Sequence, residues 1–131
     1  MTTRECSCES LFDMVAQFQE KFGHTYDGPP RRLEGPEFIF RAGHLQEELI
    51  ELRSSYLIEE EFDALIDLVF VALGLAYRMG LPFDKGFRRV YEANMKKELA
   101  SAENPGKRGN PLDVVKPAGW EPASLEDLCR G

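Results

Sequence analysis

The sequence predicts an all-α protein, a four-helix bundle followed by an irregular C-terminal arm. Residues 11–22 and 45–56 each carry apolar side chains at helical spacing. Residues 64–76 are apolar almost all round, which is typical of a central helix buried by its neighbours. We therefore expect the helix at 64–76 to pack against the others.

Length and composition favour one domain over residues 1–131, with residues 1–9 as a tail and 102–131 as the arm. The net charge of −7 argues against a nucleic-acid polymer as partner. The N-terminus has no charged-then-apolar leader and no apolar run is as long as a membrane span, so we expect no membrane partner. Cys6, Cys8 and Cys129 imply no disulfide framework, which fits free thiols in the cytoplasm.

Start and stop signals delimit the helices. The first is expected over residues 10–22, stopped by Gly23, and the second from Gly35-Pro36 to about Tyr56. After a short break near residues 54–58, a third helix runs to Met79-Gly80. The short connection makes the second and third helices antiparallel neighbours, so their acidic faces can meet.

A fourth helix is expected over residues 83–101, with Asn94 and Lys97 three residues apart on its inward face. Two interpretations stay open: a satisfied asparagine beside a lysine that extends its charge to water, or a pair that contacts phosphate and ribose. The Gly/Pro/Lys-rich arm then follows. Trp120 is one of its apolar anchors, and Ser124 with Asp127 is expected to cap a last helical turn.

Five carboxylates indicate a metal site on the second and third helices. These residues are Glu47, Glu48, Glu51, Asp63 and Asp67. Like charges at this spacing repel, and a buried unpaired carboxylate is costly, so a cation is needed. Oxygen-only ligands favour Mg²⁺ or Mn²⁺. The alternative, a solvated charged face, suits the three glutamates that open the third helix, residues 59–61.

Four stretches together resemble the all-α nucleoside triphosphate pyrophosphohydrolases, the MazG-like and phosphoribosyl-ATP pyrophosphohydrolase-like proteins. They are Arg41-x-x-x-Leu45-x-Glu47-Glu48-x-x-Glu51, Asp63-Ala-Leu-Ile-Asp67, Asn94-x-x-Lys97 and Lys116-Pro-x-Gly-Trp120. The resemblance implies a four-helix core, dimers or tetramers, and Mg²⁺-dependent cleavage of a nucleotide between its α and β phosphates.

The resemblance also implies residue roles. Glu48, Glu51 and Asp67 match the metal ligands, and Glu47 matches the position that activates water. Where much of the family has glutamate this chain has Ala64, so the fourth ligand is open between Asp63 and Glu60. The positions expected to contact substrate or phosphate are Arg41, Asn94, Lys97, Lys116 and Trp120.

The leading hypothesis is therefore a nucleoside triphosphate pyrophosphohydrolase in nucleotide-pool housekeeping, with phosphoribosyl-ATP as an alternative substrate. A di-iron or di-manganese bundle is disfavoured because no histidine follows Glu48 or Glu51 by three residues. A non-catalytic regulatory protein that binds metal or nucleotide is the alternative from another class. We interpret His44, one turn before Glu48, as structural because imidazole suits Mg²⁺ poorly.

Overall fold

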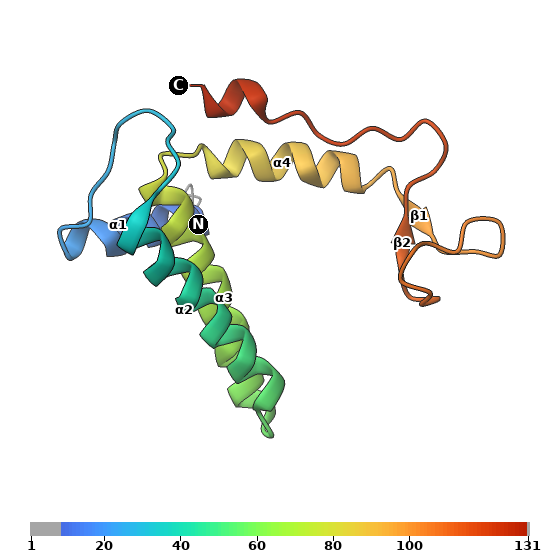
Figure 1. Cartoon of the computed structure of the whole chain (residues 1–131), viewed down its shortest axis with the longest axis horizontal. Coiled ribbons are helices and arrows are strands. Elements are labelled where there is room, and N and C mark those ends of the chain that lie inside the picture. Colours follow the sequence, from blue (N-terminus) through green and yellow to red (C-terminus); the bar gives the residue numbers. More distant parts are fainter. Residues whose placement is uncertain (1–8, 131) are drawn as a thin grey trace, which may run out of the picture. The chain divides into compact units, whose positions relative to one another are not determined.

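The computed structural model describes residues 9–130 and confirms the all-α class (Figure 1). The helices are α1 (Leu11–Lys21), α2 (Gly35–Ser54), α3 (Ile58–Arg78) and α4 (Phe83–Asn94). A two-residue strand pair, β1 (Glu98–Leu99) and β2 (Val114–Val115), and a short 3-10 helix, η2 (Glu126–Cys129), complete the described elements. The predicted tail lies almost entirely outside the described residues, and so do Cys6 and Cys8.

The chain divides into two compact units. Unit 1 comprises residues 1–84 and 128–131, and unit 2 comprises residues 85–127. The single domain expected from length stays a prediction. Among the described residues, no single helix is long and apolar enough to cross a membrane, and only α3 and α4 taken together as a bent pair pass by length and composition.

In unit 1 the helix ends follow the local signals in the sequence. The Ser10 hydroxyl accepts from the backbone N–H of Asp13 at 3.1 Å, and the Asp13 carboxylate accepts from the backbone N–H of Ser10 at 3.0 Å. This reciprocal cap fixes the start of α1. Pro36 lies in the first turn of α2, where its missing N–H costs nothing. The predicted bounds of the first three helices agree with the structure to within about two residues.

The α2–α3 hairpin runs antiparallel, and α1 packs against α3 (Figure 1). The small core gathers around Val15, Ala64, Leu73, Ala76 and Tyr77, all buried. Burial of α3 is concentrated in its C-terminal half, near α1.

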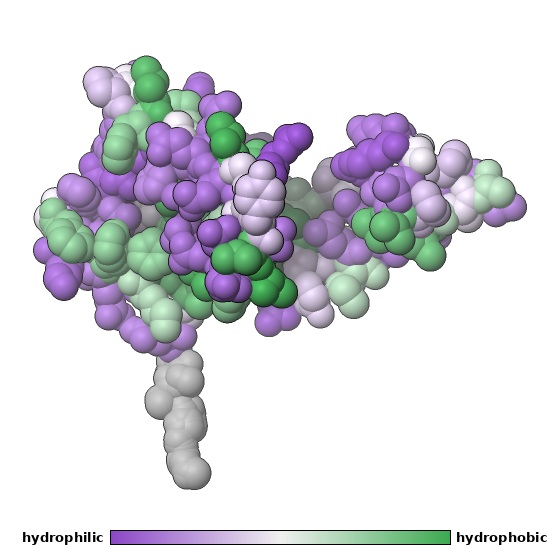
Figure 2. Space-filling view, turned by 90° about the horizontal axis from the view of Figure 1, so that it is seen from below, coloured by the Kyte–Doolittle hydropathy of each residue, from purple (hydrophilic) through white to green (hydrophobic). Residues whose placement is uncertain are grey.

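The expectation that α3 is buried on all sides is wrong for its N-terminal half. Leu65, Ile66 and Val69 are 49%, 46% and 48% exposed, because α1 and α2 cover only part of the circumference of α3 within this chain. The space-filling view shows hydrophobic side chains uncovered among hydrophilic ones on one face (Figure 2). Apolar surface of this extent is a feature of interaction sites.

In unit 2 the fourth helix is shorter than predicted. It ends at Asn94 rather than at residue 101, because the backbone N–H of Lys97 turns back to the Asn94 carbonyl at 3.0 Å and the chain then enters β1. Lys97 therefore lies after the helix and not on its inward face. Glu98 pairs with Val115 and Leu99 with Val114 in the antiparallel strand pair.

The arm is held to α4 by specific contacts within unit 2. The Trp120 indole N–H donates to the Ala93 carbonyl at 2.7 Å, which confirms Trp120 as an anchor. Arg89 binds both carboxylate oxygens of Asp127, at 2.7 and 3.0 Å. The last helical turn is present as η2, and the Asp127 carboxylate within it is bonded to Arg89.

Candidate metal and nucleotide site

Three of the predicted metal ligands converge in unit 1. Glu48 and Glu51 come from α2 and Asp67 from α3, and one carboxylate oxygen of each lies within 4.8 Å of the others. The i, i+3 spacing puts both glutamates on one helix flank, and the antiparallel hairpin brings Asp67 opposite. We call these three residues the carboxylate cluster.

The surroundings of Glu48 indicate whether this cluster suits a cation. Its Oε1 is buried and has no hydrogen-bond partner within the described part of the chain. Its Oε2 lies 3.3 Å from His44 Nε2, so His44 lies beside a cluster carboxylate. A buried carboxylate oxygen without a partner is destabilising unless a cation or donor approaches it. The donor set, three carboxylates, is one that Mg²⁺ and Mn²⁺ prefer.

Both candidates for the fourth ligand lie close to the carboxylate cluster. Asp63 and Glu60 both line a second hollow with Glu51, beside the cluster. The Glu60 carboxylate accepts from the backbone N–H groups of Tyr56 and Leu57, at 3.2 and 3.4 Å, and so serves the start of α3. Asp63 is outside the group of three but lines the same hollow as Glu51.

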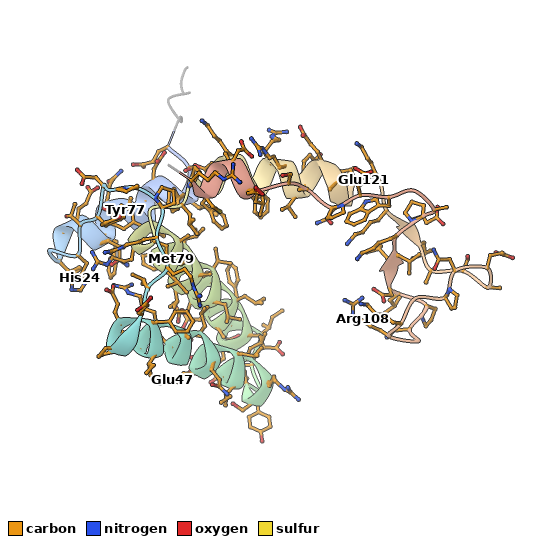
Figure 3. The ribbon with its side chains drawn as sticks, turned by 45° about the horizontal axis from the view of Figure 1, so that its top comes forward. His24, Glu47, Tyr77, Met79, Arg108 and Glu121 are labelled. Carbon is orange, nitrogen blue, oxygen red and sulfur yellow. The ribbon has the colours of Figure 1, made fainter. Side chains whose placement is uncertain are left out.

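Glu47, the predicted water-activating residue, is exposed on α2 and is not part of the cluster (Figure 3). It precedes Glu51 by four residues, so the two carboxylates occupy neighbouring positions on the helix surface. A carboxylate that holds no metal ion remains available to act on a water molecule.

Beside the carboxylate cluster is a hollow of about 320 Å³, which we call the aromatic hollow. Glu48 and Asp67 belong to both. Its other lining residues are Phe18, Gln19, His24, Phe40, Arg41, His44, Phe70 and Val71. Phe18 and Phe70 meet edge to face, with ring centroids 4.9 Å apart. Of these lining residues, the sequence pattern indicates a functional position only for Arg41, His44 and the two carboxylates. Gln19 and His24 carried no signal in the linear sequence.

Arg41 is held at the wall of the aromatic hollow by two side chains. Its Nε donates to Glu37 at 2.9 Å, and its Nη2 donates to Gln19 Oε1 at 3.4 Å. Glu37 also accepts two hydrogen bonds from Arg78, at 2.7 and 3.0 Å. Hydrogen bonds from Arg78, and less strongly from Arg41, lower the pKa of Glu37 to about 2 against the opposing effect of burial. Two guanidinium groups thus share one carboxylate.

Arg78 also joins this network to the loop after α1. Its Nη1 donates to the carbonyls of His24 and Thr25, at 3.1 and 3.0 Å. The neighbouring Tyr77 hydroxyl accepts from the backbone N–H of Tyr26 at 3.2 Å. Figure 3 shows His24 and Tyr77 at this end of the unit. These contacts fix the position of His24 at the hollow.

The remaining substrate-contact candidates lie in unit 2. The ammonium groups of Lys97 and Lys116 are 5.1 and 5.3 Å from the centre of the Trp120 ring. Extending the strand register by one step places these two lysines opposite each other. Neither forms an ion pair with a residue in the described range, whereas Arg89 and Arg108 do. Asn94 ends α4 just before Lys97.

Comparison with known proteins relates the helical part of the chain to one protein family. The model of the family described as phosphoribosyl-ATP pyrophosphohydrolase matches residues 15–94. The match covers the carboxylate cluster and Asn94 and ends before Lys97, Lys116 and Trp120. No curated protein matches the chain.

Proposed function

The chain belongs to the phosphoribosyl-ATP pyrophosphohydrolase family, and we propose that it is a nucleoside triphosphate pyrophosphohydrolase dependent on Mg²⁺ or Mn²⁺. It would cleave between the α and β phosphates to release a nucleoside monophosphate and pyrophosphate. The observation that carries this proposal is the convergence of Glu48, Glu51 and Asp67, together with a buried oxygen of Glu48 that lacks a partner in the described structure.

Glu48, Glu51 and Asp67 would hold the metal ion, with Asp63 adjacent. When bound, Mg²⁺ supplies positive charge that stabilises the charge developing on phosphate oxygens. Glu47 would orient the attacking water and accept its proton. Reactions at phosphorus depend mainly on positioning and charge neutralisation, so the chain needs no covalent nucleophile.

Four further residues would bind the nucleotide. Arg41 lies at the wall of the aromatic hollow, beside the cluster. Lys97 and Lys116 would neutralise the pyrophosphate leaving group, and Asn94 would contact phosphate or ribose. Trp120 would hold the two lysines in place, because both ammonium groups lie over its ring. Its indole N–H is already bonded to the Ala93 carbonyl.

Hydrolysis in ¹⁸O-labelled water tests the reaction directly. A panel of nucleoside triphosphates should yield pyrophosphate, with the label in the monophosphate because water attacks the α phosphorus. Label in free orthophosphate would mean attack at the γ phosphorus and would contradict the proposal.

Phosphoribosyl-ATP is the second candidate substrate, favoured by the description of the family. Including it in the same panel compares the two candidates under identical conditions. In either case we propose a cytoplasmic enzyme that associates with copies of itself.

A further inference from the structure

The aromatic hollow and the carboxylate cluster share Glu48 and Asp67. A molecule seated in the hollow would therefore have one end at the residues proposed to hold the metal. For a nucleotide, the phosphates belong at the metal, so the hollow is the space left for the nucleoside. Its volume of about 320 Å³ is at the small end of the range of about 300–1,000 Å³ for small-molecule sites.

The walls of the hollow suit a flat ring. Phe18, Phe40 and Phe70 come from three different helices and present aromatic surface to the same space. Aromatic side chains bind nucleobases by stacking, whatever the base, because every base has a π-face. The rings thus explain affinity for a base without explaining which parts of the base are recognised.

Gln19 supplies a polar group to the lining of the hollow. It is only 6% exposed, which is unusual for glutamine. Its Oε1 accepts from Arg41, which leaves one lone pair on that oxygen and the amide donors for other partners. A carboxamide has a donor and an acceptor side by side, which matches the hydrogen-bonding edge of a nucleobase.

Gly74 on α3 makes room for this glutamine. A Cβ at position 74 would lie 2.7 Å from Gln19 Nε2, a distance that real contacts do not tolerate. The amide therefore occupies space that only glycine leaves open, and any larger residue at position 74 would displace it.

We propose that the aromatic hollow binds the nucleoside with the Watson–Crick edge of its base against Gln19, and so selects ordinary nucleoside triphosphates over phosphoribosyl-ATP. This inference rests on the proposed function. Phosphoribosyl-ATP carries a second ribose phosphate on N1 of adenine, in the middle of that edge. With the edge against a buried amide, the added group has no space, and the amide loses its partner. Sites that hydrogen-bond a substrate reject analogues that cannot form the bond much more strongly than apolar pockets reject a change of size.

The test is calorimetric binding of α,β-methylene nucleoside triphosphates to the full chain with Mg²⁺. These probes resist cleavage at the bond in question. Each is compared with a counterpart methylated on the Watson–Crick edge, at N1 of purines or N3 of pyrimidines. We expect at least one unmodified probe to bind and its methylated counterpart to bind at least about tenfold more weakly.

Two variants and a control assign this discrimination to Gln19. Gln19→Leu should reduce the preference for the unmodified probe towards one, and Gly74→Ala should do the same by displacing the amide. Gln46→Leu, the same change at an exposed position on α2, should bind as the wild type does. If either variant fails to fold, as judged by circular dichroism, the comparison of probes on the wild type still shows whether the hollow recognises the Watson–Crick edge.

Equal binding of methylated and unmodified probes would overturn the inference, and so would absence of binding by all of them. Preference that persists in folded Gln19→Leu would exclude Gln19 as its source. A separate assay of pyrophosphate release on natural triphosphates keeps the two proposals apart. Selective binding without pyrophosphate release would contradict the proposed function and leave the assignment of the hollow standing.

Discussion

The buried oxygen of Glu48 that lacks a partner among the described residues should make the stability of the fold depend on a bound cation. An unsatisfied buried polar atom costs about 1–3 kcal/mol, and more when it is charged. A bound cation would remove this cost, so Mg²⁺ should raise the thermal unfolding midpoint of the chain. At a concentration of 100 Kd, binding to the folded state alone stabilises it by about 2.7 kcal/mol. Glu48→Gln should abolish most of the shift. Absence of a shift at millimolar Mg²⁺ in the wild type would contradict the metal assignment.

Glu47 should affect catalysis and leave metal binding unchanged, because it lies outside the carboxylate cluster. Glu47→Gln keeps the shape of the side chain and removes the proton acceptor. We expect turnover to fall by about 10²–10⁴-fold, while the Mg²⁺-induced thermal shift stays as in the wild type. The exposed Glu59→Gln is a suitable control. Unchanged turnover in Glu47→Gln would remove Glu47 from the mechanism.

The lowered pKa of Glu37 makes the free energy of unfolding depend on pH. Its pKa falls from 4.5 to about 2 on folding, mainly through hydrogen bonds from Arg78. The folded state therefore binds the proton more weakly than the unfolded state does. The stabilisation is fully present above about pH 4.5 and is lost as the pH falls towards 2.

Glu37→Gln should accordingly be less stable than the wild type at pH 7, with a difference that shrinks between pH 4.5 and 2. Loss of a hydrogen bond to a charged group costs about 1.5–3 kcal/mol. Urea unfolding at several pH values measures this, with Glu92→Gln on the exposed side of α4 as the control. A difference that is independent of pH would show that the Glu37 carboxylate is not the cause.

Helix bounds can be predicted from the sequence where neighbouring residues determine them. Ser10 and Asp13 cap α1, and Pro36 opens α2, so the bounds of these helices follow from neighbours in the chain. The sequence predicts a fourth helix that is too long, because residues 95–101 contain no strong local stop signal. Pairing of β1 with β2, whose residues are about sixteen positions apart in the chain, determines their structure.

The same distinction applies to the candidate site. Glu48, Glu51 and Asp67 could be predicted because helical spacing and a short hairpin connection bring them together. The aromatic hollow could not be predicted, because its walls come from α1, α2 and α3 and the sequence does not give the relative positions of these helices. Gln19 has the periodicity of an ordinary α1 residue, and its partner Arg41 lies 22 positions away.

The β1–β2 arm allows a direct measurement of anion binding. Lysines opposite each other next to a strand pair repel, and neither Lys97 nor Lys116 forms a close ion pair among residues 9–130, although Asp113 lies near enough to attract Lys97. Trp120 is the only tryptophan of the chain and lies under both ammonium groups, so its fluorescence should report pyrophosphate binding. Lys97→Ala should weaken this binding by about 1.5–3 kcal/mol and reduce turnover as well. Lys107→Ala in the same arm is the control, and equal affinity in both variants would contradict the role of Lys97.

One chain leaves much of its apolar surface uncovered. No large side chain in the described residues is fully buried. In the N-terminal half of α3, Phe62, Ile66 and Val69 follow helical spacing along one stripe and are 65%, 46% and 48% exposed. Ile39 and Ile50 on α2 are 71% and 58% exposed. Association of copies would bury these side chains and complete the core that α3 lacks within one chain.

We therefore expect a homo-oligomer, a dimer or a dimer of dimers, at micromolar concentration. Burial of an apolar side chain contributes about 1.5–3 kcal/mol, so a few such residues on each chain suffice to hold the copies together. Sedimentation equilibrium measures the mass directly against the 14.9 kDa of the chain. Ile66→Glu places a charge on the stripe and should shift the equilibrium towards the monomer, whereas Glu59→Gln in the exposed first turn of α3 should not. A wild-type monomer at micromolar concentration would contradict the expectation, and an oligomer unaffected by Ile66→Glu would show that the contact lies on another face.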